Sequence, residues 1–338
     1  MDDPMEDSQE TPDLTLETPA ENIFIAPSIS RTSILPGISY SHFTPIPSLI
    51  TSSPDTPIVL GVDEAGRGPV LGPMVYGIFY LPLSLHRSLL ADMHHFDDSK
   101  VLTATVRSQL MEKVCTPGTD LFEACGWATR VMSARDIAAG QLRPHATYNL
   151  NAQAMDATMD LIRKVFEMGV NVKEIYVDTI GSPAVYQKKL ERVFPTAKVT
   201  VAKKADSLYP CVSAASVVAK VTRDAALDVC YEAYEKDGEG EVQESSAKGW
   251  GSGYPGDARC SSWLKRNMDP VFGWGSECRF SWATAKDMLD GKEGARVQWP
   301  KPDDDGGNMR LTDFSMYDSE KGDELADWYG TKVTEAVF

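Results

Sequence analysis

The sequence predicts an α/β protein: a mixed β-sheet flanked by helices, with a disordered tail before it and a helical C-terminal part. Two kinds of apolar pattern support this prediction. Short apolar runs bounded by glycines or acidic residues are typical of buried strands. Two longer segments carry helical signals instead: residues 148–168 repeat apolar side chains at helical spacing, and residues 210–236 open with a proline and a run of small residues. Strands interleaved with helices favour one mixed sheet covered by helices.

Strands are expected at five places. The first two, 58–62 and 74–80, are separated by a glycine-rich segment, which predicts a strand–turn–strand unit. The other three are expected at 121–132, 175–177 and 199–201. The helix over 148–168 is expected to stop at Gly169, because glycine often follows the last helical turn. In the last helix, residues 213–219 are mostly small, which suits close packing on a sheet.

Charge is distributed unevenly along the 338 residues. The net charge is −16, of which residues 1–56 contribute −8 and residues 286–338 contribute −6, so the middle is close to neutral. The first tail is rich in Ser, Thr and Pro and lacks a sustained apolar pattern, which predicts disorder. The chain is therefore divided into a disordered acidic tail (1–56), a folded domain with a helical C-terminal part (57–290) and an acidic-aromatic tail (291–338).

The C-terminal tail mixes aromatic residues with acids. Its aromatic side chains are Trp299, Phe314, Tyr317, Trp328, Tyr329 and Phe338. This mixture is typical of a segment that docks on a partner, and it fits a strap across the protein's own core equally well.

Composition excludes several classes of protein. Hydrophobic residues make up 42% of the chain, which excludes a wholly disordered protein. No apolar run reaches the roughly 20 residues that cross a bilayer, and the acidic amino terminus resembles neither a secretory signal nor a transit peptide. The six cysteines never form a CxxC pair, which argues against a zinc ribbon or a disulfide scaffold and favours an intracellular, reducing environment.

Four acidic residues stand at the ends of predicted strands. Asp63 and Glu64 follow the first strand, Asp178 follows the fourth, and Asp206 comes shortly after the fifth. Ligands of open α/β sheets bind beyond strand ends, so neighbouring strands would gather these carboxylates. Carboxylates so close raise one another's pKa unless cations neutralise them. Two Mg²⁺ or Mn²⁺ ions would suit such oxygen ligands and phosphodiester hydrolysis. The alternative is that each acid is an ordinary turn residue or helix cap.

Two glycine-rich loops are candidate binding segments. The turn Gly66-Arg67-Gly68 directly follows the first two acids; glycine lets a backbone approach a ligand closely, and an arginine suits a phosphate. The second loop, 251–256, presents Tyr254, whose ring suits stacking on a base or sugar. The alternatives are an ordinary tight turn and a tyrosine closed over the core.

These residues belong to a longer series of motifs. The series runs Val62-Asp-Glu-Ala-Gly-Arg-Gly-Pro-Val-Leu-Gly-Pro73, Asp98-Ser-Lys100, Tyr176-Val-Asp-Thr179, Lys204-Ala-Asp206, Ser213-Ala-Ala-Ser216, Ala219-Lys-Val221 with Arg223-Asp224, and Gly251-Ser-Gly-Tyr-Pro255. In content and order it resembles the type 2 ribonuclease H family over about residues 58–285, and within that family the catalytic A subunit of the eukaryotic heterotrimeric enzyme.

The resemblance implies a ribonuclease H-like fold and a metal-dependent endonuclease. Such an enzyme cuts the RNA strand of RNA–DNA hybrids and cuts 5′ of a single ribonucleotide in duplex DNA, leaving a 3′-hydroxyl and a 5′-phosphate. The residues implied to bind two catalytic Mg²⁺ or Mn²⁺ ions are Asp63, Glu64, Asp178 and Asp206. The residues implied to read the ribose 2′-hydroxyl are Gly66, Arg67 and Gly68, and Tyr254 is implied to stack on the next sugar.

Basic residues beside the motifs are candidate phosphate contacts. They are Lys100, Lys204, Lys220 and Arg223. Lys220 lies four residues before Asp224 on the predicted helix, so an intrahelical ion pair is an alternative for that lysine.

The resemblance also implies partners and a location. It implies two accessory subunits that clasp the C-terminal part in a heterotrimer, a nuclear location, action on ribonucleotides and RNA primers, and no membrane. The hydrophilic residues 237–249 look like an insertion just before the Tyr254 loop, so the anchoring of that loop is open to question.

Two other functions compete with the endonuclease that the resemblance implies. An inactive hybrid-binding subunit is opposed by the presence of all four acids, and a nucleotide-binding phosphotransferase by the absence of the Lys-Ser/Thr ending of a P-loop.

Overall fold

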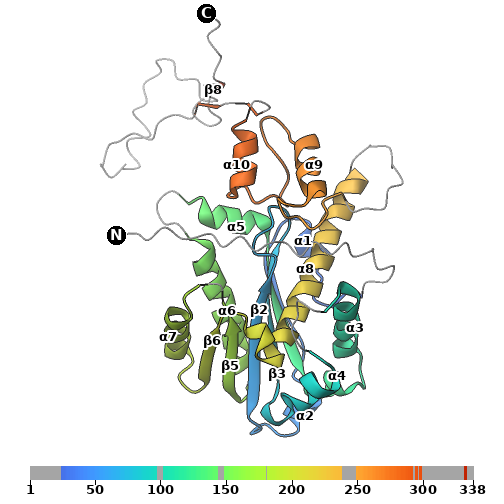
Figure 1. The fold of residues 1–338 in the computed structure, drawn as a ribbon, viewed down its shortest axis with the longest axis vertical. Helices are drawn as coiled ribbons and strands as arrows, with labels where there is room; N and C mark the ends of the chain where they lie inside the picture. Colours follow the sequence, from blue (N-terminus) through green and yellow to red (C-terminus); the bar gives the residue numbers. More distant parts are fainter. Residues whose placement is uncertain are drawn as a thin grey trace, which may run out of the picture.

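The computed structural model describes residues 24–96, 102–143, 148–179, 181–237, 249–291, 294–295, 297–298 and 331–332. Its centre is a six-stranded sheet in the order β1-β4-β3-β2-β5-β6, with helices on both faces (Figure 1). This confirms the predicted mixed sheet flanked by helices. Within these described residues, no helix is long and apolar enough to cross a membrane.

The sheet is antiparallel on one side and parallel on the other. β2 (Ile58–Ala65) pairs antiparallel with β3 (Met74–Pro82), β3 with β4 (Gly126–Met132), and β4 with β1 (Tyr40–Phe43). β2 pairs parallel with β5 (Val172–Asp178), and β5 pairs parallel with β6 (Lys198–Ala202). The strands β2, β5 and β6 therefore end at the same edge of the sheet. β2 extends beyond the predicted strand and includes Asp63 and Glu64.

The predicted strand 121–132 is a short helix followed by a strand. The helix is α4 (Asp120–Ala124), and the Thr119 side chain caps it by accepting a backbone N–H of its first turn. β4 then begins at Gly126, where a Cβ would lie 2.2 Å from the ring of Tyr80. Side-chain capping and this close contact therefore decide where the strand begins.

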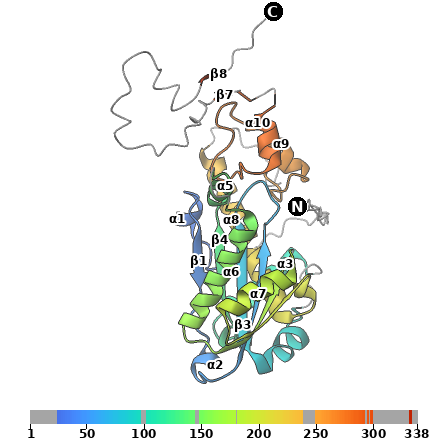
Figure 2. The same ribbon diagram turned by 90° about the vertical axis from the view of Figure 1, so that its left-hand side faces the viewer.

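Two helices cover one face of the sheet (Figure 2). α6 (Leu150–Glu167) confirms the helix predicted over 148–168, and α7 (Pro183–Val193) lies against β6. The apolar stripe of α6 packs on Leu60 and Val62 of β2. Alternate side chains of β2 are therefore committed to this face.

The long helix α8 (Pro210–Asp237) crosses the other face, together with α3 (Ala104–Cys115) and α4 (Figure 1). Two glycines permit its close approach to the sheet. A Cβ at Gly61 would lie 2.3 Å from the backbone of Cys211, and one at Gly77 would lie 2.5 Å from a carbonyl oxygen of the same helix. The small residues predicted to pack closely on the sheet do so.

The prediction of disorder over 1–56 is wrong for residues 24–56. Here β1 completes the sheet, and two single-turn helices, α1 (Arg31–Ile34) and α2 (Ser48–Thr51), flank it. Residues 1–23 lie outside the described part of the chain.

Widely spaced anchors order this N-terminal segment. Ala26, Ile34 and Ile50 are buried in three different parts of the core. The Ser28 hydroxyl is hydrogen-bonded to that of Thr222 on α8 at 2.9 Å. Because these anchors follow neither helical nor strand spacing, they produce no periodic signal in a segment rich in proline and serine.

A small helical unit lies beyond the end of α8 (Figure 1). It consists of α9 (Ala258–Arg266) and α10 (Ala283–Leu289), packed around several tryptophans. Val70 and Leu71, from the loop between β2 and β3, are buried in the same core. This C-terminal unit is therefore built onto that loop.

The remaining elements are short. They are the helix α5 (Ala134–Gln141), the 3₁₀ turns η1 (Leu83–Leu85) and η3 (Ala205–Ser207), the π turn η2 (Ser88–Met93), and the strand pair β7 (Val297–Gln298) with β8 (Thr331–Lys332). The aromatic residues predicted to dock in the C-terminal tail, from Trp299 to Phe338, lie outside the described residues.

Candidate active site

Asp63 and Asp178 lie beside each other on adjacent parallel strands. Val62 of β2 pairs with Val177 of β5, so the next residue on each strand is an aspartate. Paired residues of neighbouring strands point to the same face of a sheet. Asp63 shares the face of Gly61, which packs against α8, and it is only 6% exposed. The register of the sheet therefore places both carboxylates under α8.

The third aspartate reaches the site through a tight turn after β6. Lys204 adopts the left-handed conformation, with φ of +57°, and turns the chain. The Asp178 carboxylate accepts a 2.7 Å hydrogen bond from the Ala205 N–H, which ties this turn to the end of β5. Asp206 follows on η3 and is 5% exposed.

The pKa of Asp63 lies well above its usual range. Burial is the largest cause, and the negative charges of Glu64, Asp178 and Asp206 raise it further. A hydrogen bond with Ser216 on α8 opposes the shift. The folded chain therefore gathers more negative charge at this point than it neutralises, which favours the binding of cations.

The available donors suit a hard divalent cation. All four candidate ligands are carboxylates, which are the donors that Mg²⁺ and Mn²⁺ prefer. Across the described ranges, no three Asp, Glu, His or Cys side chains stand together as a complete ligand set. A Mg²⁺ ion does not need one, since it keeps several waters and takes substrate phosphate oxygens besides one or two carboxylates. The residues present therefore fit an ion whose coordination the substrate completes.

Glu64 projects from the opposite face of β2 to Asp63, because side chains alternate along a strand. One of its carboxylate oxygens lies 3.9 Å from the Arg67 guanidinium. The same guanidinium donates a hydrogen bond to the side chain of Asn151 on α6. The four predicted acids thus share one end of the sheet, but Glu64 reaches it from the other face and is the acid that contacts Arg67.

The turn after β2 requires glycine. Gly66 has φ of +76°, a conformation that glycine adopts without strain. A Cβ at this position would also lie 2.8 Å from the carbonyl oxygen of Pro73. The turn is therefore a tight, specific shape rather than a loose connection.

Two side chains of the C-terminal unit hold this turn. Arg279 is fully buried and donates to the carbonyl oxygens of Gly66 (2.6 Å), Arg67 (2.8 Å) and Gly72 (3.0 Å). The indole N–H of Trp282 donates to the carbonyl oxygen of Gly68 at 3.0 Å. Four carbonyls of one short loop are therefore bonded to residues more than two hundred positions away in the chain.

The Tyr254 loop packs directly on the same turn. The Gly253 carbonyl accepts hydrogen bonds from the N–H groups of Val70 (2.9 Å) and Leu71 (3.2 Å). A Cβ at Gly68 would lie 3.1 Å from the ring of Tyr254. The glycine turn and the tyrosine ring therefore form one continuous surface.

Arg223 on α8 supports the Tyr254 loop from inside. It is 7% exposed, and its guanidinium carbon lies 5.8 Å from the centre of the Tyr254 ring. It donates to the Ser252 carbonyl and, at 3.0 Å, to the Asp224 carboxylate. Asp257 holds Ser252 from the other side by accepting bonds from its N–H (2.9 Å) and hydroxyl (3.0 Å).

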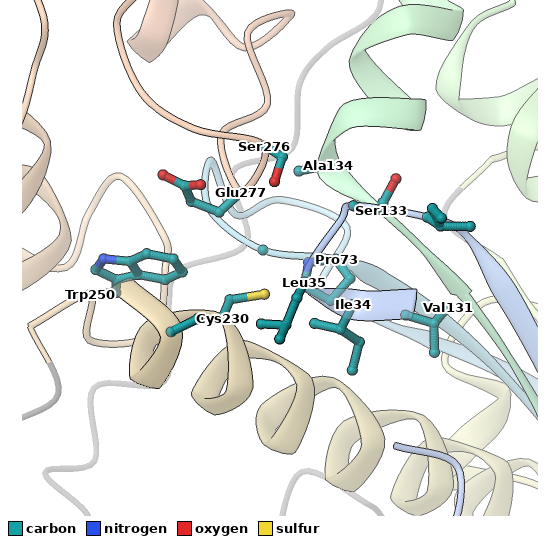
Figure 3. Close-up of a pocket in the computed structure, with 14 residues that line it drawn as sticks. Ile34, Leu35, Pro73, Val131, Ser133, Ala134, Cys230, Trp250, Ser276 and Glu277 are labelled. Atoms are coloured by element: carbon teal, nitrogen blue, oxygen red, sulfur yellow. The ribbon is translucent and has the colours of Figure 1, made fainter. Parts of the chain in front are cut away.

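A cavity of about 200 Å³ lies between α1, α8 and the C-terminal unit (Figure 3). Ile34, Val131, Cys230 and Trp250 make much of its lining apolar, and Glu277 also lines it. None of the four acids lines it. It therefore belongs to the packing of the N-terminal segment rather than to the acid cluster.

Comparison with known proteins identifies this arrangement. The family model described as Ribonuclease HII matches residues 60–285. The chain belongs to the ribonuclease HII family. Family membership confirms the prediction of a hydrolytic nuclease and decides against the phosphotransferase alternative.

Curated and solved relatives agree with this membership. The A subunit of ribonuclease H2 from Neurospora crassa is 55% identical, over 93% of this chain and 97% of the relative. The protein of the same name from Schizosaccharomyces pombe is 46% identical, over 83% of this chain and 82% of the relative. The crystal structure of ribonuclease H2 from Pyrococcus horikoshii OT3 matches with a TM-score of 0.53 at 29% identity, covering 69% of this chain and 97% of that one.

The basic residues predicted to contact phosphates lie in different environments of this ribonuclease HII family member. Lys204 is exposed at the turn before η3, and Lys220 is half-buried on α8. Arg223 is buried beneath the Tyr254 loop, where its contacts support that loop. Lys100 lies outside the described residues. Contact of these four side chains with phosphate stays a prediction.

The suspected insertion at 237–249 leaves the Tyr254 loop anchored. Residues 238–248 lie outside the described part of the chain. The loop that follows is held by Asp257 at its C-terminal end and by Val70 and Leu71 across its middle. These bonds come from elements outside the insertion.

Sequence reasoning missed Arg279 and Trp282. Both lie in Cys278-Arg-Phe-Ser-Trp282, after the last of the recognised motifs. An arginine among cysteine, aromatic and small residues is the signal that was available, because such a setting predicts burial of the charge. Its target was not predictable, since the bonded turn is far away in the sequence.

Proposed function

We propose that this ribonuclease HII family member is an endonuclease that hydrolyses the RNA strand of RNA–DNA hybrids and cuts 5′ of single ribonucleotides embedded in duplex DNA. The products are a 3′-hydroxyl and a 5′-phosphate. The observation that carries the proposal is the position of an acid cluster, unbalanced in charge, at the start of a rigid glycine turn. The cluster suits cations on a phosphodiester, and the turn suits close contact with a sugar.

The residues that would hold two Mg²⁺ or Mn²⁺ ions are Asp63, Glu64, Asp178 and Asp206. When bound, such a pair of ions supplies an activated water and stabilises the leaving oxygen of the phosphodiester. The chain itself keeps Asp63 and Asp178 in register on two paired strands and ties Asp178 to the turn that carries Asp206. The rigidity of the sheet thus supports fixed positions for the carboxylates that would hold the ions beside the scissile phosphate.

Recognition of the ribonucleotide is assigned to the glycine turn and Tyr254. The 2′-hydroxyl is the group that distinguishes RNA from DNA at a given site. A turn that lacks side chains at Gly66 and Gly68 lets its backbone approach that hydroxyl, and Arg67 suits the adjacent phosphate. The Tyr254 ring, in contact with Gly68, stacks on the next sugar.

The duplex on either side is bound through its phosphates. The proposed contacts are Lys100, Lys204, Lys220 and Arg223. Contacts of this kind weaken as salt rises, since bound counterions are released from the nucleic acid.

The assembly of this chain is proposed from its relatives. These relatives are named as A subunits, so they belong to multi-subunit proteins. We place two accessory subunits on the C-terminal part, with the aromatic residues of 291–338 as docking side chains. We also propose a nuclear location and a role in the removal of ribonucleotides and RNA primers from DNA.

The test is cleavage of an end-labelled DNA duplex that contains one ribonucleotide. The full chain is incubated with Mg²⁺ or Mn²⁺, alone and with candidate accessory subunits, beside an all-DNA duplex of the same sequence. We expect one cut, 5′ of the ribonucleotide, with the stated ends. Asp206→Asn should lower kcat at least about 100-fold, because even residues that only support a metal site typically cost 10- to 100-fold.

Asp160→Asn is the matched control, because Asp160 is an exposed aspartate on α6, paired with Arg163. It should cut at the unmodified rate. Cleavage by Asp206→Asn at the unmodified rate would reject the assignment of the acids. A chain that takes up no Mg²⁺ in a calorimetric titration and never cuts would instead be an inactive hybrid-binding subunit.

A further inference from the structure

The side chain of Arg279 makes three hydrogen bonds, all of them to one loop. It is fully buried between α9 and α10, and its Nη2, Nη1 and Nε atoms donate to the carbonyls of Gly66, Arg67 and Gly72. A guanidinium carries five N–H donors in a fixed plane, so three acceptors on one loop must match that plane. A lysine has no such fork and cannot hold three separate carbonyls in fixed directions.

Main-chain pairing brings the arginine to the loop. The N–H of Arg279 donates to the Val70 carbonyl at 2.9 Å, and the N–H of Gly72 donates to the Glu277 carbonyl at 2.8 Å. Leu71 and Cys278 form an antiparallel bridge between these two bonds. Segment 277–279 therefore lies along 70–72 as a short strand pair, independently of the arginine side chain.

Trp282 adds a further hydrogen bond to the turn. Its indole N–H donates to the Gly68 carbonyl at 3.0 Å, and the Arg279 guanidinium carbon lies 4.8 Å from the centre of its ring. Stacking on an aromatic face is a favourable setting for a buried guanidinium. The two side chains thus act on consecutive peptide units of the same turn.

Fixing the carbonyls also fixes the amide N–H groups. A peptide unit is planar and trans, so its N–H points opposite to its carbonyl. The carbonyls of Gly66 and Arg67 point toward Arg279, and the N–H groups of Arg67 and Gly68 therefore point away from it. The side of the turn that faces away from the C-terminal unit presents these two donors in a set direction.

The charge of Arg279 does not by itself favour burial at this position. Burial and the nearby charge of Arg223 lower the pKa of Arg279 to about 9, so burial opposes the charge, yet the group stays protonated at neutral pH. An apolar residue of similar volume would avoid this cost but would leave the three carbonyls without donors, so the arginine is retained for the bonds that it makes to the turn. These three hydrogen bonds determine the direction of the peptide groups of the turn.

We propose that Arg279 and Trp282 are positioning residues for ribonucleotide recognition: by binding the carbonyls of the glycine turn, they set the direction of the N–H groups and of Arg67 that meet the sugar and phosphate. This inference rests on the proposed function of the turn. It assigns a recognition role to the C-terminal unit, whose Arg279 and Trp282 bind the carbonyls of the turn and not the N–H groups that would meet the substrate.

The test compares two tryptophans of the C-terminal unit. In Trp282→Phe the ring that stacks on Arg279 remains and the bond to Gly68 is lost. In Trp274→Phe an indole bond of nearly the same length, 2.9 Å to the Leu264 carbonyl, is lost within the unit itself. Both variants are measured in the full chain, with accessory subunits if cleavage needs them.

Two readouts separate positioning from stability. The first is kcat/KM on the duplex with one ribonucleotide. The second is the ratio of Kd for an all-DNA duplex to Kd for the same duplex with one ribonucleotide, measured in EDTA so that no cleavage occurs. This ratio does not depend on the fraction of folded protein. A displacement of about 1 Å lowers a rate roughly 100-fold. Trp282→Phe removes only one of the bonds that hold the turn, so we expect a smaller loss, about 10-fold in kcat/KM, and a ratio closer to one. Trp274→Phe should leave both unchanged, although it lowers the melting temperature.

Arg279→Lys should have a larger effect, about 100-fold on kcat/KM, because it keeps the charge but loses the fork. If that variant does not fold, the comparison of Trp282→Phe with Trp274→Phe still tests the positioning role. Values of both readouts within twofold of the unmodified chain in a folded Trp282→Phe would overturn the positioning role. An unmodified chain that cuts no ribonucleotide-bearing duplex would overturn the proposed function first, and this inference with it.

Discussion

The acid cluster and the glycine turn follow one another along the chain, but different interactions hold them in place. The cluster is built on β2, β5 and η3, where packing against α8 buries Asp63 and the charges of Glu64, Asp178 and Asp206 raise its pKa further. The turn lies outside the sheet, and each of its carbonyls from Gly66 to Gly68 is bonded to a side chain of the C-terminal unit. One region carries unbalanced charge on a rigid frame; the other is a loop made rigid by hydrogen bonds.

This difference shows how the site divides its work. Carboxylates that repel one another are stabilised when cations arrive, so the cluster is at its least favourable before the ligand binds. The turn is complete before any ligand arrives, so little ordering of the backbone is left for the binding step. Chemistry is thus assigned to a destabilised part of the sheet, and recognition to a preorganised loop.

The largest effect is expected from Asp63→Asn, which tests whether the acid cluster is destabilised by its own charge. We expect activity to fall at least about 100-fold, while the free energy of unfolding at pH 7 without divalent ions stays unchanged or rises, because asparagine resembles the protonated acid that this site favours. Chemical denaturation and cleavage assays on the same preparation measure the two effects. A clear loss of stability would show that the Asp63 charge is well compensated in the fold.

The second change acts on the frame beneath the cluster. Gly61→Ala should destabilise the chain by about 3 kcal/mol, because its Cβ would lie 2.3 Å from the backbone of Cys211 on α8. Chemical denaturation measures this loss. Gly181→Ala is the control, since the nearest heavy atom to its Cβ would be 3.8 Å away. Equal stability of the two variants would mean that α8 does not need its close contact with the sheet.

Asp257→Ala tests the frame of the Tyr254 loop. Asp257 caps α9 and accepts bonds from Ser252, so its loss should cost about 1 kcal/mol near neutral pH. Burial by itself would raise the pKa of this carboxyl, but hydrogen bonds from Arg259 and Ser252 hold it well below its ordinary value of 3.8. A carboxyl whose pKa is lower in the folded state stabilises above its unfolded pKa and loses that effect as pH falls.

The difference in unfolding free energy between the unmodified chain and Asp257→Ala should therefore be full at pH 7 and shrink as pH falls below about 4. Asp160→Ala on α6 serves as the comparison, because an exposed pair contributes little at any pH. A difference that stays constant down to pH 3 would contradict the role of the ionised carboxylate.

The smallest expected effect concerns His86, at the opposite end of α8 from the Tyr254 loop. Its Nε2 accepts a 3.1 Å hydrogen bond from the Cys211 N–H, and burial lowers its pKa below 6.5. The unfolded chain therefore takes up a proton at a higher pH than the folded chain, and stability falls as pH drops through about 6.5. His86→Gln keeps an acceptor for Cys211 and should reduce this slope between pH 8 and pH 5.5. Identical slopes in denaturation experiments would exclude His86 as the cause.

Local patterns determined most of the fold and the identities of the acids. The apolar run before Asp63, the periodic residues of α6 and the small residues opening α8 each depend on neighbours within a few turns or strand positions, so the sequence shows them directly. The acids were found because they follow such runs. The same logic failed for 24–56, since Ala26, Ile34 and Ile50 are anchors without a period.

Only the tertiary structure decided which groups meet. The register of β2 and β5 sets Asp63 beside Asp178, the alternation of β2 sends Glu64 to the other face, and the pairing of 70–72 with 277–279 brings Arg279 beneath the glycine turn. These contacts join residues separated by about one hundred to more than two hundred positions. Composition and local spacing carry no information about such separations, because the packing of the whole sheet with α8 and the C-terminal unit selects them.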